Sequence, residues 1–195
     1  MSSVTENDAD VNNEADEWDL PEPSYVVTEF PNQTATSLRE HRLTLRQLRD
    51  KILAAKGATK ATMPWLKFAR FNGSPNPKGK PGSACLRYDG GVIALTGVEG
   101  DYDGGEVSLD EAADRLRMAG VVALLYTSAS HSPDKPRWRV LCPFSQELPP
   151  GERVHMMDRL NGVLGGILSG ESWTLSQSYY FGSVDGKHPV ETRIV

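Results

Sequence analysis

The stretch GVIALTGVEGDYDGGEVSLDEAADRLRMAGVVALLYT, residues 91–127, contains the pattern that decides the fold of this chain. Residues 91–98 are apolar and β-prone, and residues 121–127 form a second run of the same kind. Between them, Ser108 and Glu111 have the spacing of a capping box, which predicts that a helix begins there. This order predicts a strand–helix–strand unit whose two strands are parallel and joined by a right-handed crossover.

The sequence on either side of this unit adds helices and strands, so the chain is expected to be a mixed α+β (α/β) domain. Thr44 and Gln47 form another capping-box pair. Leu45, Leu48 and Ile52 then repeat at helical spacing. The further elements expected are helices at 44–55, 108–118 and 150–164, strands at 137–144 and 190–195, and an irregular lead-in at 25–37.

Charge divides the chain of 195 residues into an acidic tail and one domain. Residues 1–24 contain eight of the 26 acidic residues, none of the 21 basic ones and few core-forming side chains, so we expect a disordered tail there. Residues 25–195 retain 18 acidic and 21 basic residues, a formal charge of +3. This mild basic excess fits a polyanionic partner, and it also fits an ordinary protein surface.

Composition excludes several classes of protein. The chain is 38% hydrophobic and 24% charged, which allows a sizeable core. No stretch approaches the ~18 consecutive apolar residues of a transmembrane helix, and no secretory signal is visible at the N-terminus. Cys85 and Cys142 are the only cysteines, which excludes a disulfide framework and a Cys-x-x-Cys zinc site. We therefore expect a reduced, cytoplasmic protein that has no membrane partner.

Three acidic residues alternate at the end of the first predicted strand. Glu99, Asp101 and Asp103 would project from the same face of an extended chain. Their mutual repulsion is costly without a cation, and oxygen-only ligands suit Mg²⁺ or Mn²⁺. The alternative is an acidic turn, because Asp-Gly-Gly is good turn chemistry. A calcium-binding EF-hand loop fails on spacing, since Glu106 and Ala112 stand where glycine and glutamate are required.

A polar loop and a basic strand follow the second predicted strand. Ser128, Ser130 and His131 come directly after it, so we expect them within reach of the acids. Arg137 and Arg139 alternate on the returning strand and would share one face. With the acids and Lys135, these groups match the requirements of a nucleoside triphosphate site. Taken singly, His131 also fits a turn histidine, and Arg137 and Arg139 also fit a solvent-facing strand edge.

In this combination, the motifs resemble those of the archaeo-eukaryotic primase superfamily, in particular the prim-pol (RepB-like primase) domains of phages and plasmids. The resemblance covers roughly Leu45 to Val184. It rests on four segments in this order: Glu99-Gly-Asp-Tyr-Asp103, Tyr126-Thr-Ser-Ala-Ser-His131, Pro136-Arg-Trp-Arg139 and Ser176-Gln-Ser-Tyr-Tyr180.

The resemblance implies an RRM-like catalytic core, with a mixed sheet and a βαβ unit flanked by helices, that binds two divalent ions, Mg²⁺ or Mn²⁺. The first motif falls on Glu99 and Asp101, with Asp103 nearby. An acid of a third motif is expected near Ser169 or Gly170, and Glu171 is the nearest candidate. The implied catalytic residues are Glu99, Asp101 and His131, and the implied metal ligands are Glu99, Asp101, Asp103 and Glu171.

The implied activity is that of a DNA primase/polymerase of a phage or mobile element. Such an enzyme transfers nucleotides from (d)NTPs to a primer 3′-hydroxyl on a single-stranded DNA template, and a helicase is a possible partner. The implied nucleotide-binding residues are Ser128, Ser130, His131, Lys135, Arg137 and Arg139. The implied template-binding residues are Arg70, Lys78, Gln177 and Tyr179.

Three other functions compete with this one. The main alternative is a non-catalytic RRM-like module that binds single-stranded nucleic acid or nucleotides, favoured by the lack of an aspartate in the third motif. A rolling-circle nuclease would need a His-x-His pair, which the four histidines do not form. Covalent Ser/His hydrolysis around Ser128 and His131 would normally use a Gly-x-Ser-x-Gly elbow, which is absent.

Overall fold

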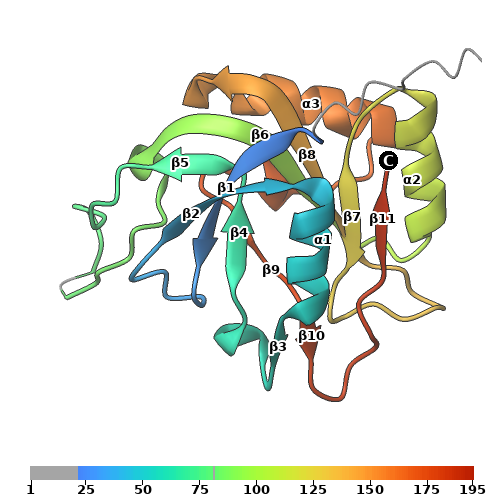
Figure 1. Ribbon diagram of the computed structural model, residues 1–195, viewed down its shortest axis with the longest axis horizontal. Helices are drawn as coiled ribbons and strands as arrows, with labels where there is room; N and C mark the ends of the chain where they lie inside the picture. The colour runs from blue at the N-terminus through green and yellow to red at the C-terminus, as the bar shows by residue number, and fades with distance from the viewer. Residues whose placement is uncertain (1–21, 81) are drawn as a thin grey trace, which may run out of the picture.

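The central sheet of the structure, a computed structural model that describes residues 22–80 and 82–195, has the strand order β11-β7-β8-β6-β5 (Figure 1). Every neighbouring pair in it is antiparallel. Its strands are β5 (Ala69–Phe71), β6 (Val92–Tyr102), β7 (Leu124–Thr127), β8 (Trp138–Leu148) and β11 (Thr192–Ile194).

The two strands of the predicted strand–helix–strand unit are parallel but are not neighbours. β6 and β7 each pair with β8, which lies between them. The crossover helix therefore leaves a gap one strand wide, and the returning strand fills it, as in a split βαβ fold. The prediction that the chain is a mixed α+β protein is confirmed. The two strands of the unit, predicted to be parallel and joined by a crossover, are separated by β8.

The three α-helices lie where the sequence predicts them: α1 (Leu45–Ala54), α2 (Leu109–Met118) and α3 (Arg153–Leu164). Thr44 and Gln47 form the reciprocal capping box before α1. Ser108 Oγ accepts a hydrogen bond from Glu111 N–H over 3.1 Å at the start of α2. The helices thus begin where side chains satisfy their first backbone donors.

The central sheet is covered on both faces. Side chains of α2 and α3 pack on one face, where Val98, Val140 and Leu125 meet Leu116 and Leu160. On the other face, α1 packs together with a second sheet of order β2-β1-β4-β9. The strands of that sheet are β1 (Ser24–Phe30), β2 (Arg39–Thr44), β4 (Trp65–Lys67) and β9 (Tyr179–Tyr180).

Strand β1 corrects the prediction that residues 25–37 are irregular. It pairs with both β2 and β4, and Val27 and Phe30 are buried in the core. Strand β1 begins at Ser24, so the end of the predicted acidic tail belongs to the domain, while residues 1–21 lie outside the described part of the chain. The shorter elements are β3 (Lys56–Gly57), parallel to β10 (Ser183–Val184), and the 3₁₀ turns η1 (Lys60–Thr62), η2 (Asp89–Gly91), η3 (Pro150–Glu152) and η4 (Gly170–Trp173).

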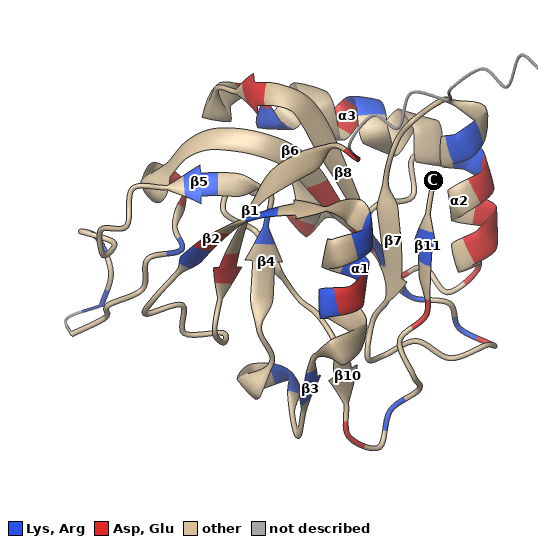
Figure 2. Ribbon diagram, viewed as in Figure 1, with Lys and Arg blue, Asp and Glu red and all other residues tan. Residues whose placement is uncertain are grey.

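The surface of the domain carries its basic residues on several elements. Figure 2 shows Lys and Arg on β2, β5, α1, β11 and several loops, without concentration on one element. A template-binding surface would therefore have to combine side chains from separate elements.

Over residues 22–80 and 82–195, none of the helices has the length and apolar character needed to cross a bilayer.

Candidate active site at one end of the central sheet

Four of the predicted site residues, Asp101, Asp103, Arg137 and Arg139, lie in two rows that cross one end of the central sheet. The inner row consists of Asp101 on β6, Arg139 on β8 and Tyr126 on β7, which are direct neighbours in the strand register. One step further out, Asp103 follows the end of β6 and pairs with Arg137, just before β8. In Figure 1, β7 ends and β11 begins at the lower side of the molecule, near the loop that follows β10.

Glu99 is buried inside the sheet and lies away from this end. Strand β6 continues to Tyr102, so Glu99 lies within the strand, and its side chain is fully buried. Lys67 Nζ and Arg153 Nη1 donate to its Oε2 over 2.7 and 2.8 Å, and Phe68 N–H donates to Oε1. Burial raises the pKa of Glu99, but Lys67 and Arg153 outweigh it and lower the pKa below its usual value. Because buried donors satisfy both oxygens, the expected catalytic and metal-binding roles of Glu99 do not fit this geometry.

Among the acids at this end of the sheet, Asp101 is the one that the fold holds most firmly. Its side chain is 5% exposed, and Oδ1 accepts a hydrogen bond from Arg139 Nε over 2.7 Å. Among the described residues, none donates a hydrogen bond to Oδ2. Burial raises the pKa of Asp101, and the negative charges of Asp103 and Glu171 raise it further, against the lowering effect of Arg139. A cation bound beside these carboxylates would relieve that repulsion.

Arg139 is fixed by its neighbours and holds Asp101 in turn. Its guanidinium lies 4.1 Å from the ring centre of Tyr180 and 5.0 Å from that of Tyr179. Nη1 donates to the backbone oxygen of Tyr180, and the residue is only 7% exposed. The expectation that Arg139 binds a triphosphate does not fit, since a phosphate would have to displace these buried contacts.

Asp103, Arg137 and Lys135 form the exposed edge of the site. Arg137 Nη1 lies 3.2 Å from Asp103 Oδ1, with the two side chains 26% and 48% exposed. The Nε of Arg137 is buried and has no hydrogen-bond partner among the described residues. Lys135 packs over Gly105, in the turn after Asp103, where an added Cβ would lie 2.8 Å from Lys135 Cγ. The side chains of Asp103 and Arg137 are therefore partly open to solvent at this edge.

Glu171 is brought to the site by a turn that is hydrogen-bonded to β6. Ser169 N–H donates to the backbone oxygen of Asp101 over 2.8 Å, and Asp101 N–H donates to Ser172 Oγ over 3.1 Å. Glu171 is exposed and lies between these two anchored serines. Glu171 is therefore close enough to Asp101 for its negative charge to raise the pKa of that carboxyl group.

Arg153 connects the turn at residues 169–172 to β6, a role that the sequence did not predict. Its Nη2 donates to the backbone oxygens of Glu99 and Ser172 over 3.2 and 2.6 Å, and the residue is 2% exposed. Gly100 lets the segment before this turn approach β6 closely, because a Cβ on Gly100 would lie 2.6 Å from Leu168 Cδ1. A glycine between Glu99 and Asp101 is the signal of this close approach in the sequence.

The loop with Ser128, Ser130 and His131 lies beyond the arginines as seen from the acids. Because β8 separates β6 from β7, the loop starts about 10 Å from the acids, two strand spacings away. The Ser128 N–H donates to the backbone oxygen of Arg137 over 3.0 Å. Lys60, a residue without a predicted role, donates from Nζ to Ser130 Oγ over 2.7 Å.

The surroundings of His131 favour the neutral form of its ring. Burial and the neighbouring His188 lower its pKa, against the raising effect of Glu191. Its Nδ1 accepts a hydrogen bond from Arg137 N–H over 3.3 Å. The proton of the neutral ring is therefore assigned to Nε2, which can donate to a ligand.

The predicted template-binding residues have different surroundings. Arg70 on β5 pairs with Glu147 and Glu40, at 2.8 and 3.5 Å. Lys78 is exposed on a long loop and Gln177 is half-buried. Tyr179 is buried against Arg139, and its hydroxyl lies 3.1 Å from Ser172 Oγ. Tyr179 is therefore a core residue and does not fit as a stacking surface for DNA.

The carboxylates fit a metal that substrate helps to hold. No group of three or more His, Cys, Asp or Glu side chains arranged to bind a metal occurs within residues 22–80 and 82–195. Asp101 and Asp103 nevertheless offer two acids on one face, and Asp101 Oδ2 has no donor there. Mg²⁺ is usually bound through one or two carboxylates together with water and substrate phosphates, and this pair meets that requirement.

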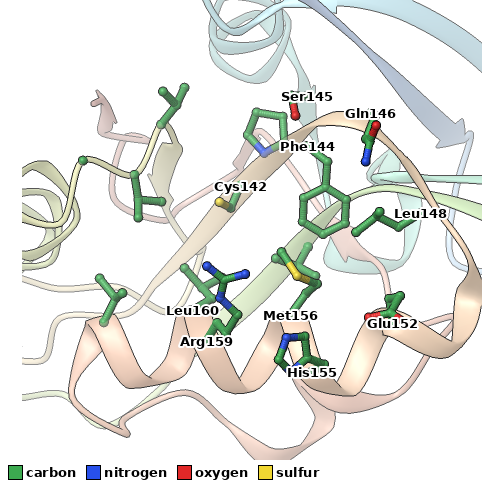
Figure 3. A pocket seen from close by; sticks show the side chains of 16 residues that line it. Cys142, Phe144, Ser145, Gln146, Leu148, Glu152, His155, Met156, Arg159 and Leu160 are labelled. Carbon is green, nitrogen blue, oxygen red and sulfur yellow. The ribbon is translucent and has the colours of Figure 1, made fainter.

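A large cavity lies elsewhere, between β8 and α3. It has a volume of about 740 Å³, and Figure 3 shows Cys142 and Phe144 of β8 facing Met156 and Leu160 of α3 across it. None of the predicted site residues lines this cavity. The end of the sheet, where acidic, basic and imidazole groups converge, is the better candidate for chemistry.

Comparisons with known proteins give two similar folds. No family model and no curated protein sequence matches the chain. The AEP domain of the primase-polymerase of cyanophage S-2L is similar at 9% identity and a TM-score of 0.44, over 87% of this chain and 80% of that one. The polymerase domain of Mycobacterium tuberculosis Ligase D, solved in complex with DNA, is similar at 15% identity and a TM-score of 0.38, over 82% of this chain and 68% of that one. At such low scores, the argument for function rests on the side chains of this chain itself.

Proposed function

We propose that this chain is a nucleotidyltransferase of the DNA primase/polymerase type, acting on nucleoside triphosphates and a single-stranded DNA template. The observation that carries the proposal is the convergence of Asp101 and Asp103, Arg137 and the loop of His131 at one end of the central sheet. Phosphoryl transfer requires acids that bind a metal ion, a positively charged side chain that binds phosphate, and a neutral imidazole that donates a hydrogen bond.

The acids have the role of holding divalent ions, Mg²⁺ or Mn²⁺. Asp101 and Asp103 would be the ligands, with Glu171 as a third acid from the turn after α3. When bound, two such ions activate the attacking 3′-hydroxyl and stabilise charge on the phosphates. Arg139 keeps Asp101 oriented, because its Nε bonds one carboxylate oxygen and leaves the other available.

Basic and polar side chains bind the substrate. The unpartnered Nε of Arg137 is a buried donor that an oxygen of a phosphate would satisfy. Ser128, Ser130 and His131 face the nucleotide, and Lys135 adds charge at the exposed edge. Arg70 and Lys78 would contribute backbone contacts to the template. A helicase partner and an origin in a phage or mobile element follow from the resemblance of the motifs.

Primer extension with Mn²⁺ tests this function. The assay compares the wild type with Asp101→Asn and Asp103→Asn, and with Asp114→Asn as a matched control at an exposed site on α2. Loss of about two or more orders of magnitude in both site variants, with an active control, supports the proposal. A wild type that binds single-stranded DNA but extends no primer contradicts it.

The second candidate is a non-catalytic module that binds nucleotides or single-stranded nucleic acid. Each of Asp101 and Asp103 pairs with an arginine, which favours this alternative because paired acids need no metal. Its signature would be binding of DNA or nucleotide that is unchanged by EDTA and by Asp101→Asn, together with no synthesis.

A further inference from the structure

Most of the residues that line the cavity between β8 and α3 are apolar, and the cavity is open at the surface. Val98, Phe144 and Leu160 form part of its wall, and Val122, also in the wall, is 52% exposed. An apolar hollow of this kind on a protein surface indicates a docking site for another apolar group. The polar side chains of the wall are Ser145, Gln146, Glu152, His155 and Arg159.

A bulge in β8 contributes part of this wall. In the register of β6 and β8, Gly97 pairs with Pro143. Two residues earlier on β6, Leu95 pairs with Leu148, which lies five residues later on β8. Four residues of β8, 144–147, therefore face a single residue of β6 and leave the regular ladder. Beside the cavity, these four residues line a smaller hollow of about 140 Å³ together with Ser24, Tyr25, Val26, Arg42 and Thr96.

The first described residues of the chain lie close to the same cavity. Burial raises the pKa of Tyr25, and the nearby Glu22 and Cys142 raise it further, so the Tyr25 side chain lies within reach of both groups. Cys142 is part of the cavity wall. Glu22 Oε2 lies 3.6 Å from Arg46 Nε, at the start of α1. The chain that precedes Glu22 therefore begins near the edge of the cavity.

The sequence before Glu22 supplies apolar side chains within reach of this cavity. Trp18 and Leu20 are the large apolar residues nearest to the domain. At ~3.3–3.6 Å per residue, Leu20 can lie up to ~7 Å from Glu22, and Trp18 up to ~14 Å. The wall formed by η3 and α3, from Glu152 to Val163, is ~16 Å long. Both apolar side chains can therefore reach the wall.

Charge favours the same segment. Trp18 lies between two acidic residues, Glu17 and Asp19. Arg159 is exposed in the cavity wall, and Figure 3 shows its side chain extending from α3 toward β8. Glu152, the carboxylate of the wall, lies seven residues earlier, which is ~10 Å along a helix. An acidic residue beside Trp18 can therefore pair with Arg159 while it remains distant from Glu152.

We propose that residues 16–20 of this chain bind in the β8–α3 cavity, with Trp18 and Leu20 against its apolar wall and an acidic neighbour of Trp18 paired with Arg159. The bound segment covers apolar surface that includes the exposed side chain of Val122. This interaction is independent of the proposed function, because none of the residues that take part in it belongs to the candidate active site.

Limited proteolysis of the full chain tests this docking. Chymotrypsin cleaves after accessible aromatic residues, and mass spectrometry follows cleavage of the bond after Trp18. The wild type is compared with Val122→Glu and Arg159→Glu in the cavity wall, and with Val154→Glu as the matched control. Val154 is 54% exposed on α3 and lies outside the cavity. Because cleavage requires the undocked segment, we expect it to be roughly tenfold or more faster in the cavity variants and within about twofold of the wild type in the control.

Three results would overturn the proposal. The first is cleavage of the wild type after Trp18 as fast as that of a synthetic peptide of residues 12–24. The second is the same cleavage rate in the cavity variants as in the control, with circular dichroism melts confirming that each variant is folded. The third is cleavage of the wild type that accelerates on dilution, which would assign the cavity to the segment of a second copy. A rate that is independent of protein concentration supports docking within one chain.

Discussion

Asp101 on β6 and Arg139 on β8 are direct partners in the sheet, and Arg139 Nε donates to Asp101 Oδ1 over 2.7 Å. Both side chains are almost completely buried, at 5% and 8% exposure. The acid with the strongest claim to a catalytic role is therefore oriented by an arginine that is itself held among three tyrosines. The following predictions start from this arrangement.

Arg139→Met is expected to lower the free energy of unfolding by about 3–5 kcal/mol, because it leaves the buried Asp101 carboxylate without its partner. The double variant Arg139→Met/Asp101→Leu should regain much of this loss, since it removes the charge as well. Urea denaturation measures both. A single variant within about 1 kcal/mol of the wild type would mean that the pair does not stabilise the fold.

Ser172→Ala is expected to destabilise the protein by about 1–2 kcal/mol, because the buried N–H of Asp101 and the hydroxyl of Tyr179 both lose a partner. Ser169→Ala is the matched control, since at the start of the same turn its side chain forms no capping hydrogen bond with the described residues. The control should stay within about 0.5 kcal/mol of the wild type. Equal stability of the two variants would contradict the assigned contact.

The stability difference between the wild type and Glu99→Gln is expected to depend on pH. Lys67 and Arg153 lower the pKa of Glu99 in the folded state below its ordinary value of 4.5. Ionised Glu99 therefore contributes its full stabilisation above pH 4.5, and this contribution is lost as the pH falls through the folded-state pKa. Chemical denaturation between neutral and acid pH should show the advantage of the wild type shrinking on the acid side. An advantage that grows with acidity would reverse the assigned sign.

Cys142 is expected to be unreactive in the folded protein. Burial raises the pKa of its thiol to about 11, so almost no thiolate is present at pH 8. In a Cys85→Ser variant, which leaves Cys142 as the only thiol, reaction with a disulfide reagent should be slow before denaturation and complete after it. Rapid reaction of the native variant would show that the wall of the β8–α3 cavity opens readily.

The helices could be predicted from the sequence because their signals are local. Thr44 with Gln47, and Ser108 with Glu111, satisfy backbone donors within one turn, whatever the rest of the chain does. Strand β1 carried no such signal, since it is stabilised by pairing with residues 39–44 and 65–67. A strand of this kind is visible only once its partners are placed.

Only part of the candidate site could be predicted, because strand alternation is a local signal and the surroundings of each acid are not. Alternation correctly indicated that Glu99 and Asp101 share a face, but it could not distinguish their environments. Glu99 is neutralised by Lys67 and Arg153, from segments distant in the chain, whereas Asp101 lies at the end of the sheet. Whether a carboxylate binds a cation or a buried ammonium depends on such long-range contacts, which one sequence does not reveal.

The position of β8 between β6 and β7 also constrains how the polypeptide folds. The strand–helix–strand unit cannot complete its sheet alone, because its two strands leave a gap that only residues 138–148 fill. Pairings that span large loops are the slow steps of folding. Emerging from the ribosome, the acids and the imidazole would therefore remain apart until β8 has been synthesised and docked, and the reactive centre would assemble together with the closing of the sheet.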